Sequence, residues 1–442
     1  MKNKLTTGNI TKSLLIFTIP LILSGLFQQL FNWVDAFIVG NVAGESALAG
    51  IGATTSIYNL FVTVITGFTS GLSVLAAQQY GMNDEEGIAH TLSSYSAILG
   101  VGFAFISFAG AIFTEEILIL LDTPESIFVS AESYLKTIFL GVPFLAVYNT
   151  YSAVLRGIGN SKAPFLSILV SSVINVGLDL FFVAGLDLGA AGAAIATVIA
   201  QVAMTFYIVI YSVRKYPALR FRFINVKYLK NGARFGLPPS IQSGVSSVGN
   251  VYLQQFMNGF GEQTVAAITT AYRVDTVIFL PIINFGSGIA TIVAQNIGAG
   301  KQKRAEKVFK IGVIIMAIIS VCLTILVFLS GEHLIALFGL TADSVEIGKN
   351  FFRSIAKFYL VYGLSMAIRG YLEGTGDMAF SGIVGALSLL VRIVCSYVLK
   401  STFGNMVVAY AEAFSWIFLL AVFFLRYCCR IRLKDRKTNS KI

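Results

Sequence analysis

Long apolar stretches, seldom interrupted by a charged residue, constrain the fold of this 442-residue chain more than any other feature. Apolar residues make up 56% of the sequence and charged residues only 12%, whereas a soluble protein has roughly 25% charged residues. A chain so poor in charge cannot cover a water-exposed surface. The stretches are therefore predicted to cross a membrane as helices. A β-barrel would alternate apolar and polar residues instead, so the predicted fold is an all-α integral membrane protein.

Twelve stretches are long enough to form transmembrane helices, which need about 20 residues each. They divide into an N-terminal half at 1–213 and a C-terminal half at 233–428, joined by a basic linker at 214–232 and followed by a tail at 429–442. The predicted spans are 14–40, 49–79, 88–114, 130–158, 162–186, 189–213, 233–258, 264–297, 305–330, 350–372, 380–402 and 406–428.

The loops between these spans differ in charge. Lys and Arg gather before the first span, in the linker, after the eighth span and in the tail, whereas the alternate loops are acidic. Because basic loops stay on the cytoplasmic side, both termini are predicted to be cytoplasmic, in the cell membrane. The net charge of +10 then indicates topology and not nucleic-acid binding. For the linker, a solvated loop is favoured over contact with anionic lipid.

The two halves resemble each other at a constant offset of 217 residues. At this offset Gly44-Glu45 aligns with Gly261-Glu262, and the turn at 155–160 aligns with that at 372–377. Six helices per repeat is an even number, so both copies insert with the same orientation. The sequence thus predicts two six-helix lobes related by a pseudo-two-fold axis along the membrane normal, an organisation typical of transporters.

Two carboxylates lie inside predicted spans of the first half, where a charge is costly. Asp35 in the first span and Asp179 in the fifth are expected at a similar depth, with Asn175 one helical turn before Asp179. Thr197 and Tyr134 can add hydroxyls. Such a set suits a monovalent or divalent cation or a shared proton, although the two carboxylates could also be separate and individually satisfied. The second half has Tyr252, Arg392, Ser396 and Phe414 at the positions of Asp35, Asn175, Asp179 and Thr197, which favours a functional site in the first half.

The second half carries its own membrane charges, namely Arg273, Asp275, Arg392 and Glu412. Pairing of Arg392 with Glu412 or Asp275 across helices is the simpler interpretation. The alternative is that Asp275 or Glu412 faces the substrate.

The sequence offers no means of catalysis. It contains no P-loop, its two histidines do not form a zinc motif, and its four cysteines suggest no disulfide framework. The protein is therefore not expected to be an enzyme or to need a cofactor other than a coupling ion. Uphill transport would have to use an ion gradient.

Several motifs together resemble the multidrug and toxic compound extrusion (MATE) family of secondary transporters. They are Val34-Asp35, the Leu155–Asn160 turn, Asn175-x-x-x-Asp179 and the segment at 293–300. The resemblance implies a V-shaped pair of six-helix lobes that export drug-like, often cationic compounds in exchange for Na⁺ or H⁺. It assigns the coupling site to Asp35, Asn175, Asp179 and Thr197, cavity groups to Tyr134 and Asn149, and a bend in the first helix to Pro20. Family branches with acidic cation-binding residues in helices seven and ten find no match, so the chain is similar to the branch that couples through the N-lobe.

The predicted function is thus cation-coupled multidrug efflux by alternating access. A flippase for a lipid-linked precursor is the alternative, although a pyrophosphate headgroup would require a more basic cavity. An intramembrane enzyme or a receptor is less consistent with the sequence. The predicted partners are small molecules and the lipid bilayer, with no nucleic acid, and the protein is expected to be a monomer. The substrate and the choice between Na⁺ and H⁺ cannot be read from these residues.

Overall fold

The computed structural model describes residues 5–439, with side chains as far as Arg432, and this part of the chain contains helices but no strand. The all-α prediction is therefore confirmed. The helices are α1 (Ile10–Ile38), α2 (Gly44–Gly81), α3 (Glu85–Ile112), α4 (Thr114–Leu120), α5 (Glu125–Phe139), α6 (Val142–Gly157), α7 (Lys162–Asp179), α8 (Gly189–Lys215), α9 (Val226–Asn258), α10 (Glu262–Ile278), α11 (Leu280–Gly298), α12 (Gln302–Ala336), α13 (Ala342–Ile355), α14 (Tyr359–Gly374), α15 (Met378–Val398), α16 (Lys400–Phe403) and α17 (Val407–Asn439).

The helices have the length and composition needed to cross a membrane. Within the described residues, nine helical runs meet both requirements, or ten if the bent pair α5–α6 forms one span. One run, Ile10–Gly81, is 72 residues long and contains both α1 and α2, while the more polar α9 is not among the nine. Each of the twelve predicted spans falls on one or two of these helices.

Three predicted spans are broken in their interior, and the third and eleventh are broken near their ends, at Phe113 and Leu399. The fourth is broken between α5 and α6, the eighth at Phe279, and the tenth by a short 3₁₀ turn, Ala356–Phe358. Pro143 and Pro281 lie in the first turn after the breaks in the fourth and eighth spans. A proline there lacks the N–H needed by the preceding turn and its ring crowds that turn, so the helix has to restart.

The internal repeat is visible in the backbone. Gly44 and Gly261 have φ values of 86° and 89°, and Gly159 and Gly376 have 90° and 91°. Each pair is separated by the 217 residues of the repeat, and each occupies a left-handed conformation that glycine adopts without strain. The two halves therefore turn in the same way at equivalent positions, as the repeat predicts.

The chain forms two compact units whose limits fall inside helices. One, here called the N-unit, is Ile19–Ser240, and the other, the C-unit, joins the segment ending at Thr18 to the chain from Ile241 onward. The limits lie beside Pro20 in α1 and beside Pro238-Pro239 in α9, so each of these helices begins in one unit and ends in the other. The predicted domain limits at 213 and 233 follow the ends of transmembrane spans, whereas these two units are defined by how densely their residues pack. The predicted limits therefore stay a prediction.

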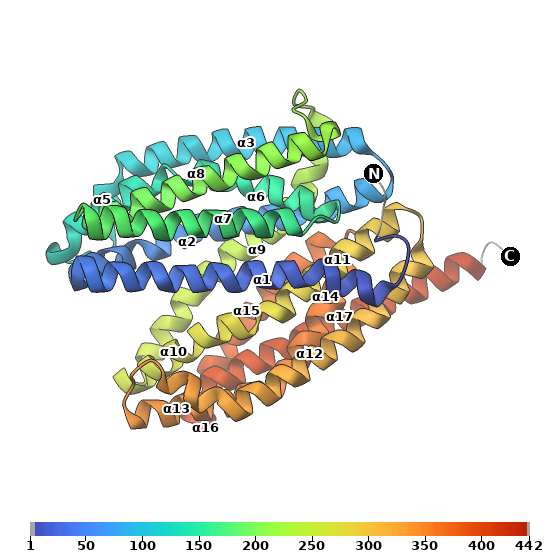
Figure 1. The fold of residues 1–442 in the computed structure, drawn as a ribbon. Helices are drawn as coiled ribbons and strands as arrows, with labels where there is room; N and C mark the ends of the chain where they lie inside the picture. The colour runs from blue at the N-terminus through green and yellow to red at the C-terminus, as the bar shows by residue number, and fades with distance from the viewer. Residues whose placement is uncertain (1–4, 440–442) are drawn as a thin grey trace. The chain divides into compact units, whose positions relative to one another are not determined.

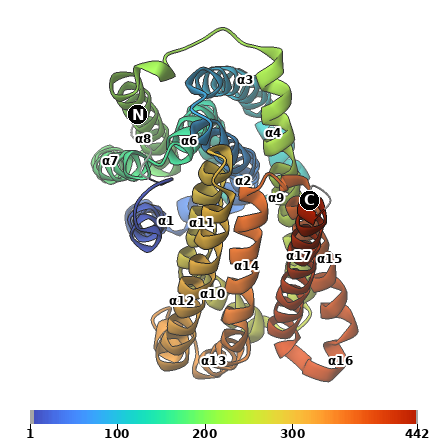
Figure 2. The ribbon, with the colours of Figure 1, turned by 90° about the vertical axis from the view of Figure 1, so that its right-hand side faces the viewer.

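Each unit is built from closely packed helix pairs. In the N-unit, α2 packs against α5 and α6, and α7 packs against α8 (Figure 1). In the C-unit, α11 packs against α12 and α14, and α15 packs against α17 (Figure 2). A buried apolar cluster in the N-unit includes Tyr134 of α5, Val39 after α1 and Val183 after α7, and Val34, next to Asp35, and Val176, one helical turn before Asp179, pack against it.

Candidate functional site

Asp35 and Asp179 meet within the N-unit. Their carboxyl groups lie within hydrogen-bonding reach of each other, one from α1 and the other from α7. Asp179 has no exposed surface, and Asp35 is partly buried. The sequence left open whether these carboxylates are separate, and the structure brings them together.

The pair lacks hydrogen-bond donors. Among the described residues, no N–H or O–H donates to either carboxyl oxygen of Asp179 or to Oδ1 of Asp35. Two ionised carboxylates that touch in an apolar environment repel each other, and burial adds a desolvation cost. The arrangement is favourable only when a proton or a cation lies between the two oxygens.

Irregular helix ends accompany both carboxylates. Asp179 is the last α-helical residue of α7 before a π-helical turn, Leu180–Gly185, and a second π-helical turn, Val39–Ala43, follows α1 shortly after Asp35. The two turns contact each other. Such turns occur often at functional sites, because the wider helix leaves backbone carbonyls without their usual partner.

The other predicted ligands lie nearby on neighbouring helices. Asn175 of α7 donates from Nδ2 to Thr197 Oγ1 of α8 at 3.5 Å, which is a long hydrogen bond. Tyr134 is 8% exposed, and its hydroxyl is close enough to both carboxylates to interact with them electrostatically. The amide oxygen, the two hydroxyls and the carboxylates thus belong to one region of the N-unit.

Two polar residues in this region were missed in the sequence. Gln201 of α8 donates from Nε2 to the hydroxyl of Tyr58 on α2 at 2.7 Å, and its Oε1 is buried without a partner among the described residues. Tyr58 packs against the same apolar cluster that contains Tyr134. A neutral polar residue in a long span gives little warning in a sequence, since its cost of burial is small beside that of a carboxylate.

Two other predicted residues have local roles in the structure. Asn149 of α6 is buried and donates from Nδ2 to the Leu145 carbonyl oxygen in its own helix at 2.9 Å. Pro20 lies inside α1, where its carbonyl oxygen accepts from Ser24 Oγ at 2.7 Å. A cavity role for Asn149 and a bend at Pro20 remain predictions.

The charges of the C-unit form pairs. Arg392 of α15 donates from Nη2 to Glu412 Oε2 of α17 at 3.0 Å and to the Tyr272 hydroxyl at 2.6 Å. Asp275 of α10 accepts at Oδ1 from the Tyr359 hydroxyl at 2.6 Å. The structure therefore contains the predicted Arg392–Glu412 pair, while Arg273 is exposed, on a different side of α10 from Asp275.

These charges line a pocket of about 320 Å³ inside the C-unit. Asp275 is 2% exposed, and its Oδ2 has no donor among the described residues, so one carboxylate oxygen remains available. The other lining residues are Asn250, Leu253, Gln254, Met257, Tyr272, Thr276, Phe279, Arg392 and Glu412.

Across residues 5–432, whose side chains the structure describes, no group of three His, Cys, Asp or Glu side chains is placed to hold a metal ion. The donor set in the N-unit, two carboxylates with neutral oxygens nearby, fits a small monovalent cation or a proton.

Comparison with known proteins connects this architecture to one family. The MatE family model matches residues 20–181 and again residues 238–398, once in each half and over most of the chain. The probable multidrug resistance protein YpnP of Bacillus subtilis is 29% identical, with 96% of each chain covered. The multidrug export protein MepA of Staphylococcus saprophyticus is 24% identical over 98% of this chain and 97% of its own.

Solved structures share the fold. The outward-facing conformation of a multidrug resistance MATE family transporter of the MOP superfamily matches with a TM-score of 0.91 at 20% identity, over 99% of both chains. A MOP superfamily transporter from Pyrococcus furiosus matches with a TM-score of 0.89 at 20% identity, over 98% of both chains. The reverse polarity of that protein's binding pocket suggests that it has a different function. The fold is therefore that of twelve-helix, two-lobed transporters.

Proposed function

This chain belongs to the MatE family of multidrug efflux transporters, and from that premise we propose that it exports drug-like, often cationic compounds in exchange for Na⁺ or H⁺ by alternating access. The Asp35–Asp179 pair is the proposed coupling site, with Asn175 and Thr197 as supporting ligands. No cofactor other than the coupling ion is needed, and a monomer is sufficient because one chain carries both carboxylates.

The observation that carries this proposal is the contact of Asp35 with the fully buried Asp179, in which both oxygens of Asp179 and Oδ1 of Asp35 lack a donor among the described residues. A site of this kind is unfavourable when empty and favourable when occupied by a proton or a cation. Because one carboxylate belongs to α1 and the other to α7, occupancy changes the force between these two helices. An ion that draws α1 towards α7 can therefore favour one conformation over another.

Coupling requires opposed preferences of ion and substrate. If the ion binds more tightly to the conformation that binds substrate weakly, then ion entry promotes substrate release. Tyr134 and Asn149 are proposed to contact substrate in the N-unit. Asp275 and Glu412, which line the C-unit pocket, are proposed as further contacts for a cationic group.

The proposal is tested by ethidium transport in proteoliposomes, with a Na⁺ gradient or a pH gradient imposed separately. One of the two gradients is expected to drive transport. Ethidium transport that responds to neither gradient would contradict ion coupling.

Variants then locate the coupling site. Asp35→Asn and Asp179→Asn are expected to abolish gradient-driven transport while the protein still inserts in the membrane. Asp187→Asn is the matched control, since Asp187 is exposed in the loop after α7 and undergoes the same chemical change. Full transport by both pair variants would contradict the assignment.

The proposed orientation places the protein in the cell membrane with both termini in the cytoplasm. It is tested with single cysteines in a variant that lacks the four native ones. A membrane-impermeant maleimide applied to intact cells is expected to label Asp343→Cys and not Lys303→Cys. The reverse pattern would invert the topology.

A further inference from the structure

The linker between α8 and α9 exposes an unusual mixture of side chains. From Arg220 to Lys227 every residue is exposed, and none is acidic. Four of the eight are apolar, and their exposed fractions are 66% for Phe221, 89% for Phe223, 51% for Ile224 and 78% for Val226. The other members include Arg220, Arg222 and Lys227. By contrast Leu219, directly before them, is 1% exposed in the apolar core of the N-unit.

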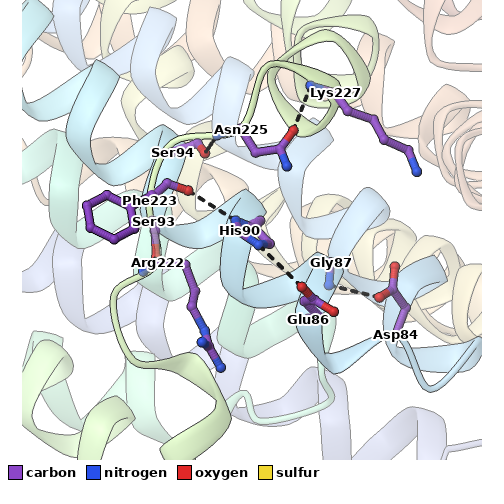
Figure 3. Close-up of polar contacts among 10 residues, drawn as sticks. All are labelled: Asp84, Glu86, Gly87, His90, Ser93, Ser94, Arg222, Phe223, Asn225 and Lys227. Carbon is purple, nitrogen blue, oxygen red and sulfur yellow. Dashed lines mark hydrogen bonds and ion pairs between the residues drawn. The ribbon is translucent and has the colours of Figure 1, made fainter.

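This exposure is fixed by hydrogen bonds from the linker to α3 (Figure 3). The backbone N–H of Arg222 donates to Ser93 Oγ at 2.9 Å, and His90 Nδ1 lies 3.1 Å from the Phe223 carbonyl oxygen, to which it donates. The backbone N–H of Asn225 lies 3.5 Å from Ser94 Oγ. These contacts to α3 hold the backbone of the segment, while its apolar side chains stay exposed.

Further contacts hold the end of the segment. The ring of Tyr228 stacks on that of His90 with centroids 5.0 Å apart, and the Tyr95 hydroxyl donates to the Leu229 carbonyl oxygen. The segment is therefore anchored at both ends, by Leu219 in the core and by Tyr228 and Leu229 on α3. A flexible loop would let its phenylalanines collapse on the protein, whereas this one holds them apart from it.

The charge of the segment calls for an anionic partner. Among the side chains of residues 5–432, Arg220, Arg222 and Lys227 form no ion pair with a carboxylate. The nearby acids on α3 have other contacts: Asp84 accepts from the Gly87 N–H at 2.8 Å, and Glu86 lies 3.6 Å from His90 Nε2. Basic residues interleaved with large exposed apolar residues, beside a transmembrane bundle, match the boundary between lipid headgroups and acyl chains.

We propose that the segment 220–227, here called the linker anchor, inserts its apolar side chains at the headgroup–acyl boundary and binds anionic phospholipid through Arg220, Arg222 and Lys227. The leaflet concerned is the cytoplasmic one in the proposed orientation. Because α9 begins at Val226, lipid contact would fix the position of the start of α9 relative to the membrane surface.

Fluorescence in vesicles tests the position of the anchor. Phe223→Trp is made in a variant with Trp33→Phe and Trp416→Phe, so that it carries a single tryptophan. In vesicles of equal parts phosphatidylglycerol and phosphatidylcholine, brominated acyl chains are expected to quench this tryptophan, and aqueous iodide is not. Quenching by iodide alone would show a solvated linker, and quenching by neither would show that protein covers it. Either result would overturn the proposal.

A charge-matched pair of variants tests the lipid preference. With bromine on phosphatidylglycerol, quenching is expected to be about threefold greater than with bromine on phosphatidylcholine. Arg220→Gln/Arg222→Gln/Lys227→Gln should remove this difference, whereas Lys303→Gln/Lys307→Gln/Lys310→Gln, which removes the same charge from another basic loop, should preserve it. An equal effect of both triple variants would contradict specific binding by the anchor. The readout does not depend on transport, so it remains informative if the coupling proposal fails.

Discussion

Asp35 of α1 and Asp179 of α7 place their carboxyl groups within hydrogen-bonding reach of each other, although no donor among the described residues contacts Asp179. A bound cation or a shared proton would therefore make this contact favourable. The pair links the first helix of the N-unit to its fifth predicted span. Binding of the coupling ion to this pair should raise the free energy of unfolding, which can be measured without a transport assay.

Removal of one carboxylate should stabilise the ion-free protein and remove its response to the ion. A ligand that binds only the folded state adds about 2.7 kcal/mol to the free energy of unfolding at a concentration of one hundred times Kd. Wild-type protein is therefore expected to unfold at a higher temperature as Na⁺ is added or as pH falls, depending on the coupling ion. Asp179→Asn should unfold at a higher temperature than wild type without the ion and respond little to it.

Thermal unfolding in detergent, with Na⁺ and pH varied separately, measures this effect. Asp187→Asn should behave like wild type, because Asp187 is exposed and outside the pair. An unchanged ion response in both Asp35→Asn and Asp179→Asn would place the stabilising ion elsewhere.

The Arg392–Glu412 pair should show a strong dependence on both partners. Glu412→Ala leaves a buried guanidinium without its carboxylate, and loss of one partner of a buried pair costs about 3–5 kcal/mol. Arg392→Met/Glu412→Leu should recover much of that loss, because no charge then remains buried. Thermal unfolding of the single and double variants measures the recovery. If the double variant were as unstable as Glu412→Ala, packing and not charge would explain the loss.

The exposed pair of Lys136 with Glu132 provides a control for these measurements. The two residues form an i, i+4 ion pair on α5, where solvent screens the charges. Glu132→Ala is expected to leave the unfolding temperature unchanged. A loss comparable with that of Glu412→Ala would mean that the assay does not distinguish buried from exposed pairs.

Substitutions of Asp275 and Tyr359 should have different effects on the binding of cationic and neutral compounds. Tyr359→Phe removes the only hydrogen bond seen at Asp275 Oδ1 and should cost about 1–3 kcal/mol of stability while keeping the carboxylate in the pocket. Asp275→Asn should weaken binding of cationic compounds more than that of neutral ones. Equilibrium dialysis measures how tightly cationic and neutral compounds bind to each purified variant. Equal weakening of both classes by Asp275→Asn would argue against a direct contact with the cation.

The membrane topology was predictable because a charge in a span is costly and therefore rare. Asp35 and Asp179 could be selected in the sequence for that reason, and the repeat offset showed that the second half lacks them. Their meeting across α1 and α7 needed the structure, because spacing places a residue on a helix face but not against a given neighbour.

Other features left weaker signals in the sequence. Gln201 and Tyr58 are neutral and were missed, and Asn149, predicted as a cavity group, donates to its own helix. The breaks before Pro143 and Pro281 follow a known property of proline, whereas the 3₁₀ turn at 356–358 contains no proline and depends on packing. Each of α1 and α9 begins in one compact unit and ends in the other, which depends on tertiary packing and cannot be predicted from a local sequence pattern.

The repeat predicts one further pair of equivalent effects, at Gly157 and Gly374. A Cβ atom at Gly157 would lie 2.7 Å from Ala76 Cβ on α2, and one at Gly374 would lie 2.6 Å from the Ala290 carbonyl oxygen on α11. Both glycines let two helices approach closely, as small residues do in membrane helix packing. Gly157→Ala and Gly374→Ala should each cost about 1–3 kcal/mol of stability, since neighbouring backbone has to shift.

Two other helical glycines serve as controls for this prediction. A Cβ atom at Gly102 or Gly244 would have no atom within 4 Å, so alanine there should be neutral or slightly stabilising through its better helix propensity. Because Gly157 belongs to the N-unit and Gly374 to the C-unit, the two losses should add in the double variant. Thermal unfolding of the four single variants and the double variant is the measurement. If Gly157→Ala and Gly102→Ala lowered the unfolding temperature equally, close helix packing at Gly157 would not explain the loss, because a Cβ atom at Gly102 meets no neighbour.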